Sequence, residues 1–283
     1  DDWMDNAYHK SLRQEYNVNV QNATDHVNYY ASFGYLNTQG ITDNSNFERI
    51  NGRLKADSQL KDWLKVGGNM AFVHYEAKSM SEDGSSNSSG NPIAVAMTTA
   101  PIYPLFIRNA DGSVKYDAYG NKMYDYGDGG NAGLERQQWT GSNALSDALL
   151  NQNAYEGNAF NAVGFAEVRF LKDFTFTTTN TVTVDETRSH DVTNPYYGNY
   201  ASSNGITYVA HSRGYVYNFE QMLAWGHQFG AHKVDVTLAH DAYRSKSYSL
   251  SGQKSNMFDP NNFELNNAIT DGSPASSRST YNN

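Results

Sequence analysis

The densest group of residues able to do chemistry is a set of carboxylates between residues 109 and 130. Asp111, Asp117, Asp125 and Asp128 alternate there with glycine and tyrosine. Carboxylate oxygens are ligands that calcium prefers, so Asp111 and Asp117 are weak candidates for a cation site. Their spacing matches no EF-hand loop, however, and Asp and Gly are also the common residues of turns. We therefore predict turns in this segment, with no resident metal and no other cofactor.

The sequence lacks the motifs of the common catalytic centres. Eight histidines are spread along the chain, without an HExxH pattern, and there is no GxSxG nucleophile motif. The chain has no cysteine, so neither a disulfide nor a thiolate metal site can form in it. We predict that the protein is not an enzyme. A barrel enzyme with a Ser/His pair at its rim is the last of the alternatives.

Aromatic side chains in polar loops are the candidates for ligand binding, because a flat ring stacks on a sugar or a peptide and loops commonly carry ligand contacts. Trp139, Tyr196 and Tyr197 are the substrate-binding candidates. Their alternative role is packing of loop against loop or against a partner. A second set has the pattern of lipid-facing or interfacial residues on strands: Tyr29, Phe33, Tyr35, Phe174, Phe176 and Trp225.

The elements that hold the second aromatic set, and from which the loops extend, are strands. Apolar and polar residues alternate with period two, which is typical of a strand with one buried face and is not typical of a helix. The predicted strands lie near 15–21, 27–36, 47–57, 64–76, 161–170, 174–188, 215–228 and 233–250. Long loops are predicted over 77–157, 189–213 and 251–283, and a short helix is possible within NPIAVAMTTAPIYPLF. All six prolines fall in these loops, as expected because proline cannot donate to a sheet ladder.

The two faces of the strands predict a membrane barrel. One face carries full charges, such as Arg53 and Lys55, so it must meet water, while the other face is apolar. No apolar stretch reaches the about 20 residues of a membrane helix, but a barrel strand needs only alternate apolar residues. The net charge of −9 argues against a nucleic-acid partner. We predict an all-β, antiparallel transmembrane barrel segment of about eight strands with long extracellular loops, all in one domain.

The order of turns and loops predicts where the chain ends lie. Short turns join the first strand to the second, the third to the fourth, the fifth to the sixth and the seventh to the eighth. If short turns are periplasmic, both chain ends are extracellular, and the chain is an interior piece of a larger barrel. The sequence also begins without an initiator methionine or a signal peptide, as a mature or truncated piece would.

Several segments resemble a known family. The start DDWMDNAYHK, with its Asp2-Trp3 pair, the run Tyr29–Leu36, the segment NFERINGRLKADSQLKDWLKVGG and the later AVGFAEVRFLKDF are similar to the barrel of SusC/RagA-type TonB-dependent transporters, of the kind found in Bacteroidetes. The match continues in order over the first 75 residues or so and recurs up to the eighth strand. The resemblance implies a 22-stranded outer-membrane barrel with a plug in its lumen. This chain shows neither a TonB box nor a plug segment, so it would correspond to part of the barrel.

The resemblance also implies partners and a function. These are a SusD-like surface lipoprotein, TonB acting through an N-terminal region outside this chain, membrane lipid and lipopolysaccharide, and a dimer of the transporter–lipoprotein pair. The implied function is import of oligosaccharides or peptides across the bacterial outer membrane. The alternative is a secreted, β-rich carbohydrate-binding module, which requires the apolar faces to pair within the chain. A plug sequence upstream of Asp1 would distinguish the two.

Overall fold

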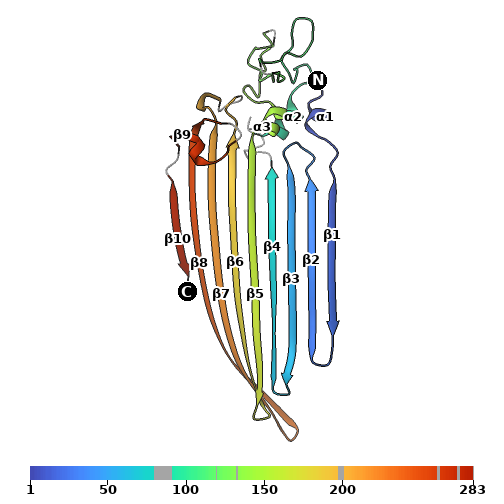
Figure 1. Cartoon of the computed structure of the whole chain (residues 1–283), viewed down its shortest axis with the longest axis vertical. Helices are drawn as coiled ribbons and strands as arrows, with labels where there is room; N and C mark the ends of the chain where they lie inside the picture. The colour runs from blue at the N-terminus through green and yellow to red at the C-terminus, as the bar shows by residue number, and fades with distance from the viewer. Residues whose placement is uncertain are drawn as a thin grey trace.

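The protein is built around one large antiparallel sheet. The computed structural model describes residues 1–79, 91–118, 120–131, 133–196, 201–259, 262–272 and 275–282. In this part of the chain, ten strands form a single sheet in the order β1-β2-β3-β4-β5-β6-β7-β8-β10, and β9 pairs with β8 off this path (Figure 1). Every pair of neighbours is antiparallel, as the sequence predicts.

The strands are long and follow one another in sequence order. They are β1 (Arg13–Ala23), β2 (Val27–Gln39), β3 (Asn46–Lys61), β4 (Leu64–Ser79), β5 (Gln152–Phe170), β6 (Phe174–Thr193), β7 (Ile206–Phe229), β8 (His232–Met257), β9 (Ala268–Asp271) and β10 (Ser276–Asn282). Each of the eight predicted strands corresponds to one of β1 to β8. Because consecutive strands pair directly, the topology is a simple up-and-down meander.

The two ends of the sheet differ sharply, and we call them the turn end and the loop end. Connections of two or three residues join β1 to β2, β3 to β4, β5 to β6 and β7 to β8 at the turn end. At the loop end lie the long connections, the short helices and the first residues of the chain (Figure 1). The predicted alternation of short turns and long loops is therefore a real asymmetry of the sheet.

Several strands extend further toward the loop end than the sequence predicts. β5 begins at Gln152 instead of residue 161, and β7 begins at Ile206 instead of residue 215, so parts of the predicted loops 77–157 and 189–213 are strand. In these extensions polar residues occupy both faces, so hydrophobic periodicity disappears while the backbone ladder continues. Periodicity reports what surrounds a strand, not where its hydrogen bonds stop.

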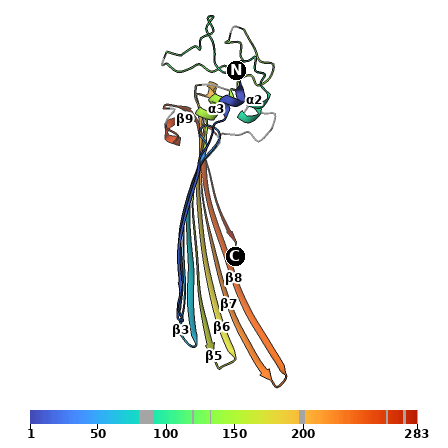
Figure 2. The ribbon, with the colours of Figure 1, turned by 90° about the vertical axis from the view of Figure 1, so that its right-hand side faces the viewer.

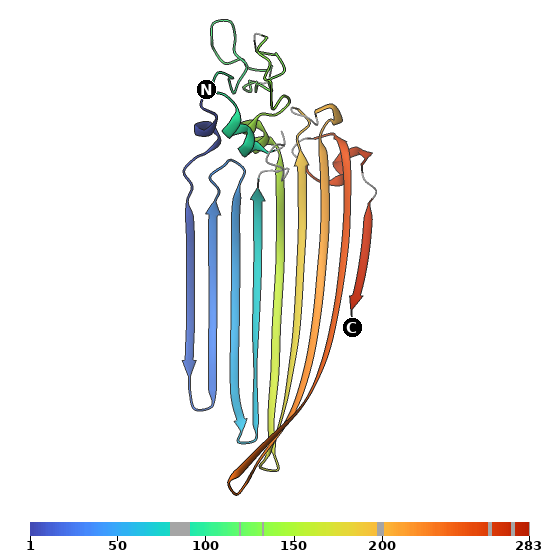
Figure 3. The same cartoon turned by 180° about the vertical axis from the view of Figure 1, so that it is seen from behind.

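The predicted loop over 251–283 is wrong in part. β8 continues to Met257, a 3₁₀ turn at Leu265–Asn267 leads into β9, and β10 pairs with β8, Tyr281 lying opposite Lys246. β10 runs back from the loop end toward the turn end (Figure 3), so the described chain ends beside Ser245 of β8 and not at the loop end. The sequence of β10, SSRSTYN, carries no apolar alternation, and its place is set by the backbone ladder with β8.

Three short helices lie at the loop end: α1 (Trp3–Ala7), α2 (Pro92–Thr98) and α3 (Ala144–Leu150). Each begins at a side chain that accepts backbone N–H groups, Asp2 for α1, Asn91 for α2 and Asn143 for α3. α2 is the short helix expected within NPIAVAMTTAPIYPLF. No helix in the described part of the chain is long and apolar enough to cross a membrane.

The sheet is a single curved layer, seen nearly edge-on in Figure 2. Among the described residues, the buried apolar clusters lie near the loop end and not across the sheet. The sheet is also open: β1 pairs only with β2, and β10 covers β8 only from Ser245 to Ser251. Both edges therefore present unpaired backbone groups, which a closed barrel would not leave.

Candidate functional site

The register collects most of the apolar residues of the long strands on one face, with exceptions such as Phe165 on the other. Residues directly opposite in an antiparallel pair share a face. One such row crosses six strands: Ala31, Leu54, Met70, Ala162, Val182 and Tyr217. Phe33 and Leu54 are each 55% exposed and Leu238 is 70% exposed. We call this surface the apolar face, and it also carries all six aromatic residues predicted to face lipid.

The apolar face has a defined width along the strands. On β6 it runs from Phe174 to Val184, and Glu186 then follows on the same face. On β4 the change comes between Phe72 and His74. This span matches the about 9–11 residues that a tilted strand needs to cross a bilayer. The face beyond it, toward the loop end, is charged, as expected of strands that continue into water.

Aromatic rings mark the turn end of the apolar face. Phe170 and Phe174 stack with ring centres 5.5 Å apart, and Trp225 lies 6.5 Å from Phe174 and 6.2 Å from Phe229. His227 completes this group, bonded to Asp173 at 2.7 Å. Amphipathic rings at this level form the girdle of a membrane barrel.

A polar patch interrupts the apolar face near its middle. Thr178, Gln221 and His240 occupy one row of β6, β7 and β8, and Asn180 lies in the next row. Nδ1 of His240 lies 2.9 Å from Oε1 of Gln221, and the Asn180 amide donates to Thr178 at 3.3 Å. Pairing within the patch reduces the cost of placing these groups in an apolar surrounding.

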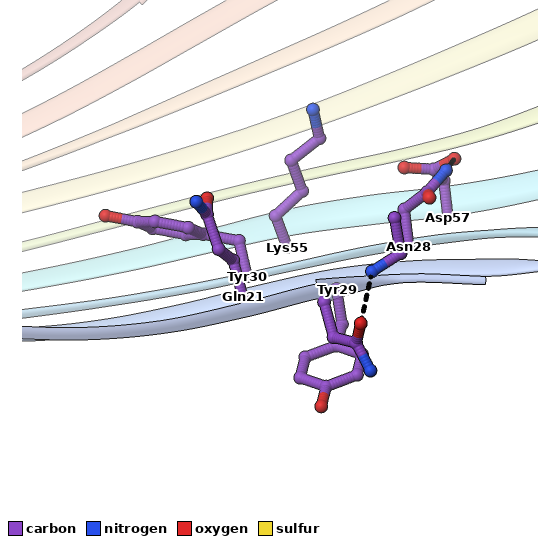
Figure 4. A pocket seen from close by; sticks show the side chains of 8 residues that line it. Gln21, Asn28, Tyr29, Tyr30, Lys55 and Asp57 are labelled. Carbon is purple, nitrogen blue, oxygen red and sulfur yellow. Dashed lines mark hydrogen bonds between the residues drawn. The ribbon is translucent and has the colours of Figure 1, made fainter.

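The opposite face, which we call the polar face, carries the charges predicted for it. Lys65 lies 3.6 Å from Asp57, which also accepts a hydrogen bond from Asn28 at 3.0 Å. Near the turn end, a shallow pocket of about 550 Å³ is lined in part by Tyr30 and Lys55. Figure 4 shows these two side chains on one side of the ribbon and Tyr29 on the other. The polar face therefore carries charged and hydrogen-bonded side chains where the other face carries apolar ones.

Three aromatic rings lie on the polar face close to the loop end. Phe47 of β3, Tyr75 of β4 and Tyr155 of β5 follow one another across the sheet. The Phe47 and Tyr75 ring centres are 6.3 Å apart, and those of Tyr75 and Tyr155 are 6.2 Å apart. Arg49 lies directly opposite Tyr75 in the register. We call these four residues the aromatic row.

The long β4–β5 connection and the segment before β1 fold together above the sheet. Trp3 is 2% exposed and packs with Val95, Leu105 and Ala144. Its indole N–H donates to the carbonyl of Tyr103 at 2.9 Å. The Asp2-Trp3 pair thus has a structural role, in which Asp2 caps α1 and Trp3 anchors the long connection.

Two buried charges lie in this loop core. Arg136 donates to the carbonyls of Asp125 and Ser142, and its guanidinium lies 5.3 Å from the Trp3 ring. Burial lowers the pKa of Arg136, while the nearby Asp125 opposes that shift. Burial raises the pKa of Asp147 to about 6, against hydrogen bonds from Ser142 and the Asn143 backbone. The loop core is held by polar contacts as much as by apolar packing.

Comparison with known proteins supports the resemblance seen in the sequence. A TonB-dependent receptor of Formosa agariphila, "TonB-dependent receptor P26", is 30% identical to the chain over 112 residues, which are 40% of this chain and 10% of that protein. No family model matches the chain. Solved structures of the RagAB peptide importer superpose on 99% of the chain, with a TM-score of 0.73 in the 'closed-closed' state and 0.72 in the 'open-open' state, at 18% identity.

The chain is therefore similar in sequence to a TonB-dependent receptor over 112 residues, and it shares its fold with part of the RagAB importer. It spans 30% of the superposed chain of the 'closed-closed' RagAB structure, so it corresponds to part of the length of such a receptor. The open sheet with two unpaired edges agrees with that coverage.

The three aromatic residues predicted to bind substrate do not come together. Trp139 packs against the loop core, with a φ of 62° and a buried indole N–H that bonds to no described residue. Tyr196 lies after β6 and is 56% exposed. Tyr197 lies outside the described residues. The packing of Trp139 agrees with its alternative, structural role, and substrate contact by these residues stays a prediction.

The predicted cation ligands hold turns. The Asp111 carboxylate accepts the Ser113 backbone N–H at 2.9 Å and the Ser113 hydroxyl at 2.6 Å, and these bonds lower the pKa of Asp111. Asp117 accepts the backbone N–H of Asn121 at 2.8 Å. No three acidic or histidine side chains of the described chain gather closely enough to hold a metal ion.

Sequence reasoning missed the aromatic row. Tyr155 falls in a predicted loop, so its face could not be assigned, and Phe47 and Tyr75 come from separate strands. The sequence did contain part of the information needed to find the aromatic row. Phe47, Arg49 and the other odd-numbered residues of the third strand share a face, which places Phe47 on the charged side.

Proposed function

We propose that this chain forms part of the wall of an outer-membrane importer that takes up oligosaccharides or peptides, driven through TonB. The apolar face meets lipid, and the polar face lines a lumen. The two open edges continue into further strands that close the barrel. No chemistry is performed on the substrate, and the protein acts by admitting and releasing it.

The observation that carries this proposal is the apolar face that extends across the long strands of a single-layered sheet. In lipid every backbone group must be paired, so a sheet survives there only as a closed barrel. A wall with lipid on one side and water on the other needs one apolar and one polar face, as this sheet has. The similarity to a TonB-dependent receptor and to the RagAB fold supports the same function.

We propose the partners that such an importer needs. A SusD-like surface lipoprotein would close over the loop end, as the pairing in the RagAB complexes suggests. TonB would act through another part of the receptor. Membrane lipid and lipopolysaccharide would surround the apolar face and the charged strand ends above it, and two transporter–lipoprotein pairs would associate into a dimer.

The alternative, a secreted carbohydrate-binding module, has less support. It needs a second layer to bury the apolar face. The described residues form one sheet, and large side chains such as Leu238 remain 70% exposed on it. A soluble protein rarely leaves so extensive an apolar surface bare.

The test is the behaviour of the complete receptor in its own cells. We expect it in the outer-membrane fraction, extractable only with detergent, and migrating faster on a gel when unboiled because the closed barrel resists unfolding. Release into buffer without detergent, with identical migration of boiled and unboiled samples, would contradict the proposal.

A further inference from the structure

The aromatic row is shaped to present ring faces to the space beside the polar face. Tyr75 lies opposite Gly157 of β5, and its ring lies so close to the Gly157 Cα that a Cβ there would collide with it. The glycine therefore lets the ring lie down on the sheet instead of standing upright. Tyr155, at right angles to it, is 38% exposed.

Arg49 is the charged member of the row, and nothing in the described chain neutralises it. It makes no ion pair with a described residue, and its Nε is buried without a hydrogen-bond partner. The neighbouring Glu48 and Glu76 belong to the opposite face by the alternation of β3 and β4. Because Nε is buried, an incoming acceptor is limited to the two terminal nitrogens of the guanidinium.

Toward β7 the same rows are neutral and rich in hydroxyl groups. Continuing from Tyr75 across β6 and β7, the register brings Thr187 and Ser212 into line, and the row of Tyr155 continues into Ser189. Toward β1, the row of Arg49 continues into Glu15 and the row of Phe47 into Arg13, and these two side chains form an ion pair with each other.

Two acids of β6 lie on this face outside these rows. Asp185 lies one row closer to the turn end than Thr187, and Asp191 lies one row beyond Ser189. The surface thus combines ring faces and hydroxyl groups with the unpaired Arg49 and the mutually paired Arg13 and Glu15.

We propose that the aromatic row binds an oligosaccharide that carries anionic substituents, carboxylate or sulfate. This rests on the proposed function and names the substrate class that the wall would contact. A sugar ring has one face of C–H groups, which packs on the negative face of an aromatic ring. The forked donors of Arg49 match a carboxylate or a sulfate, and hydroxyl side chains match a hydroxyl-rich ligand.

A peptide fits this surface less well. An extended peptide gains affinity by adding to a free sheet edge. Here β3, β4 and β5 are paired on both sides, so no edge is available. A neutral oligosaccharide would leave Arg49 without an acceptor. The combination of three rings and one unpaired guanidinium therefore favours a charged sugar.

The experiment measures binding by calorimetry to the complete receptor, purified in detergent. The probes are short oligogalacturonates, sulfated carrageenan fragments, neutral malto-oligosaccharides and a glutamate-rich peptide. The variants are Tyr75→Ala, Arg49→Gln and Arg49→Lys. The matched control is Tyr35→Ala, which removes a tyrosine from the apolar face at a similar level of the sheet. Migration of unboiled samples on a gel shows whether each variant still forms its barrel.

We expect one or both acidic sugars to bind. Comparison of the oligogalacturonates with the carrageenan fragments shows whether the site prefers a carboxylate or a sulfate. Tyr75→Ala should weaken that binding about fivefold, which is the usual effect of one aromatic contact. Arg49→Gln should weaken that binding about tenfold or more, because a charge-assisted hydrogen bond is lost. The affinity of Arg49→Lys should lie between those of Arg49→Gln and the wild type. Tyr35→Ala should have no effect.

Four results would overturn the inference: no acidic sugar binds, neutral sugars bind equally well, the peptide binds in their place, or the Tyr75 and Arg49 variants bind like the wild type. Each can occur in a receptor that still forms a heat-resistant barrel in the outer membrane. The proposed importer function would then stand while the substrate class fails.

Discussion

At the scale of single residues, position in the fold decides between roles that the residue type leaves open. Trp3 and Trp139 are both candidates for stacking by type, yet both pack in the loop core. Asp111 and Asp117 have the oxygens of a cation site and use them to hold turns. Arg49 carries no special signal in the sequence, and it becomes of interest because the described chain leaves it unpaired beside three rings.

The buried carboxyl of Asp147 predicts a pH dependence of the loop core. Its pKa is raised above the ordinary 3.8 to about 6 by burial, so the folded form binds a proton more tightly than the unfolded form. The stability of the core should therefore fall as pH rises through this interval, and stay lower above pH 6. Hydrogen exchange of the α3 amides should show weaker protection at pH 7.5 than at pH 5, after correction for intrinsic rates.

Asp147→Asn removes the titration and keeps an oxygen that accepts from Ser142. We expect its α3 protection to be independent of pH, and Asp5→Asn on α1 to behave like the wild type. An unchanged pH difference in Asp147→Asn would show that another group is responsible.

At the scale of elements, each strand serves two environments along its length. The half toward the turn end carries most of the apolar face. The half toward the loop end has lost this alternation and holds the loops. This division explains why the strands appear shorter in the sequence than in the structure, as at Gln152 and Ile206.

Adjacent residues of β6 offer a matched test of the two faces. Val182 belongs to the apolar face and Thr181 to the polar face. Val182→Arg should lower the free energy of unfolding of the complete receptor by about 1 kcal/mol, since the cost of arginine on the lipid face falls from the centre of the apolar zone toward its boundary, near which Val182 lies. Thr181→Arg should change it little, because its side chain meets water.

Urea unfolding of each variant in lipid vesicles measures its free energy of unfolding relative to the wild type. Equal losses would mean that the two faces meet the same surroundings. The lipid assignment of the apolar face would then be wrong.

At the scale of the whole molecule, the asymmetry between the ends of the sheet has a functional direction. The turn end is closed by tight connections, while the loop end carries the helices and the long connections (Figure 1). The loop core and the aromatic row lie at or near this end. In a receptor that imports, the larger end is the one that meets the substrate. The open edges at β1 and β8 require further strands, so the chain describes one side of that entrance.

The orientation can be read by labelling, since the chain itself has no cysteine. Lys115→Cys lies in the long β4–β5 connection, and Asp62→Cys lies in the turn between β3 and β4. With a membrane-impermeant maleimide on intact cells, we expect labelling of the first variant and not of the second. After lysis both should react. Labelling of Asp62→Cys alone in intact cells would reverse the proposed orientation.

The sequence by itself determined the strand type, the two faces and the alternation of turns and loops. These follow from local chemistry, because a side-chain period of two and the presence of turn-forming residues involve only residues close together in the sequence. It also indicated a short helix within NPIAVAMTTAPIYPLF, and the structure places α2 there after the Asn91 cap. The resemblance to the SusC/RagA type came from the same local segments.

Only the tertiary structure decided which residues meet. Phe47, Tyr75 and Tyr155 are brought together by the registers of β3, β4 and β5, which depend on pairing across a long connection. The same holds for Trp3, which contacts a segment about 100 residues away, and for β10, placed by the ladder with β8. Such contacts are set by backbone hydrogen bonds and packing between distant segments, and no local pattern records them.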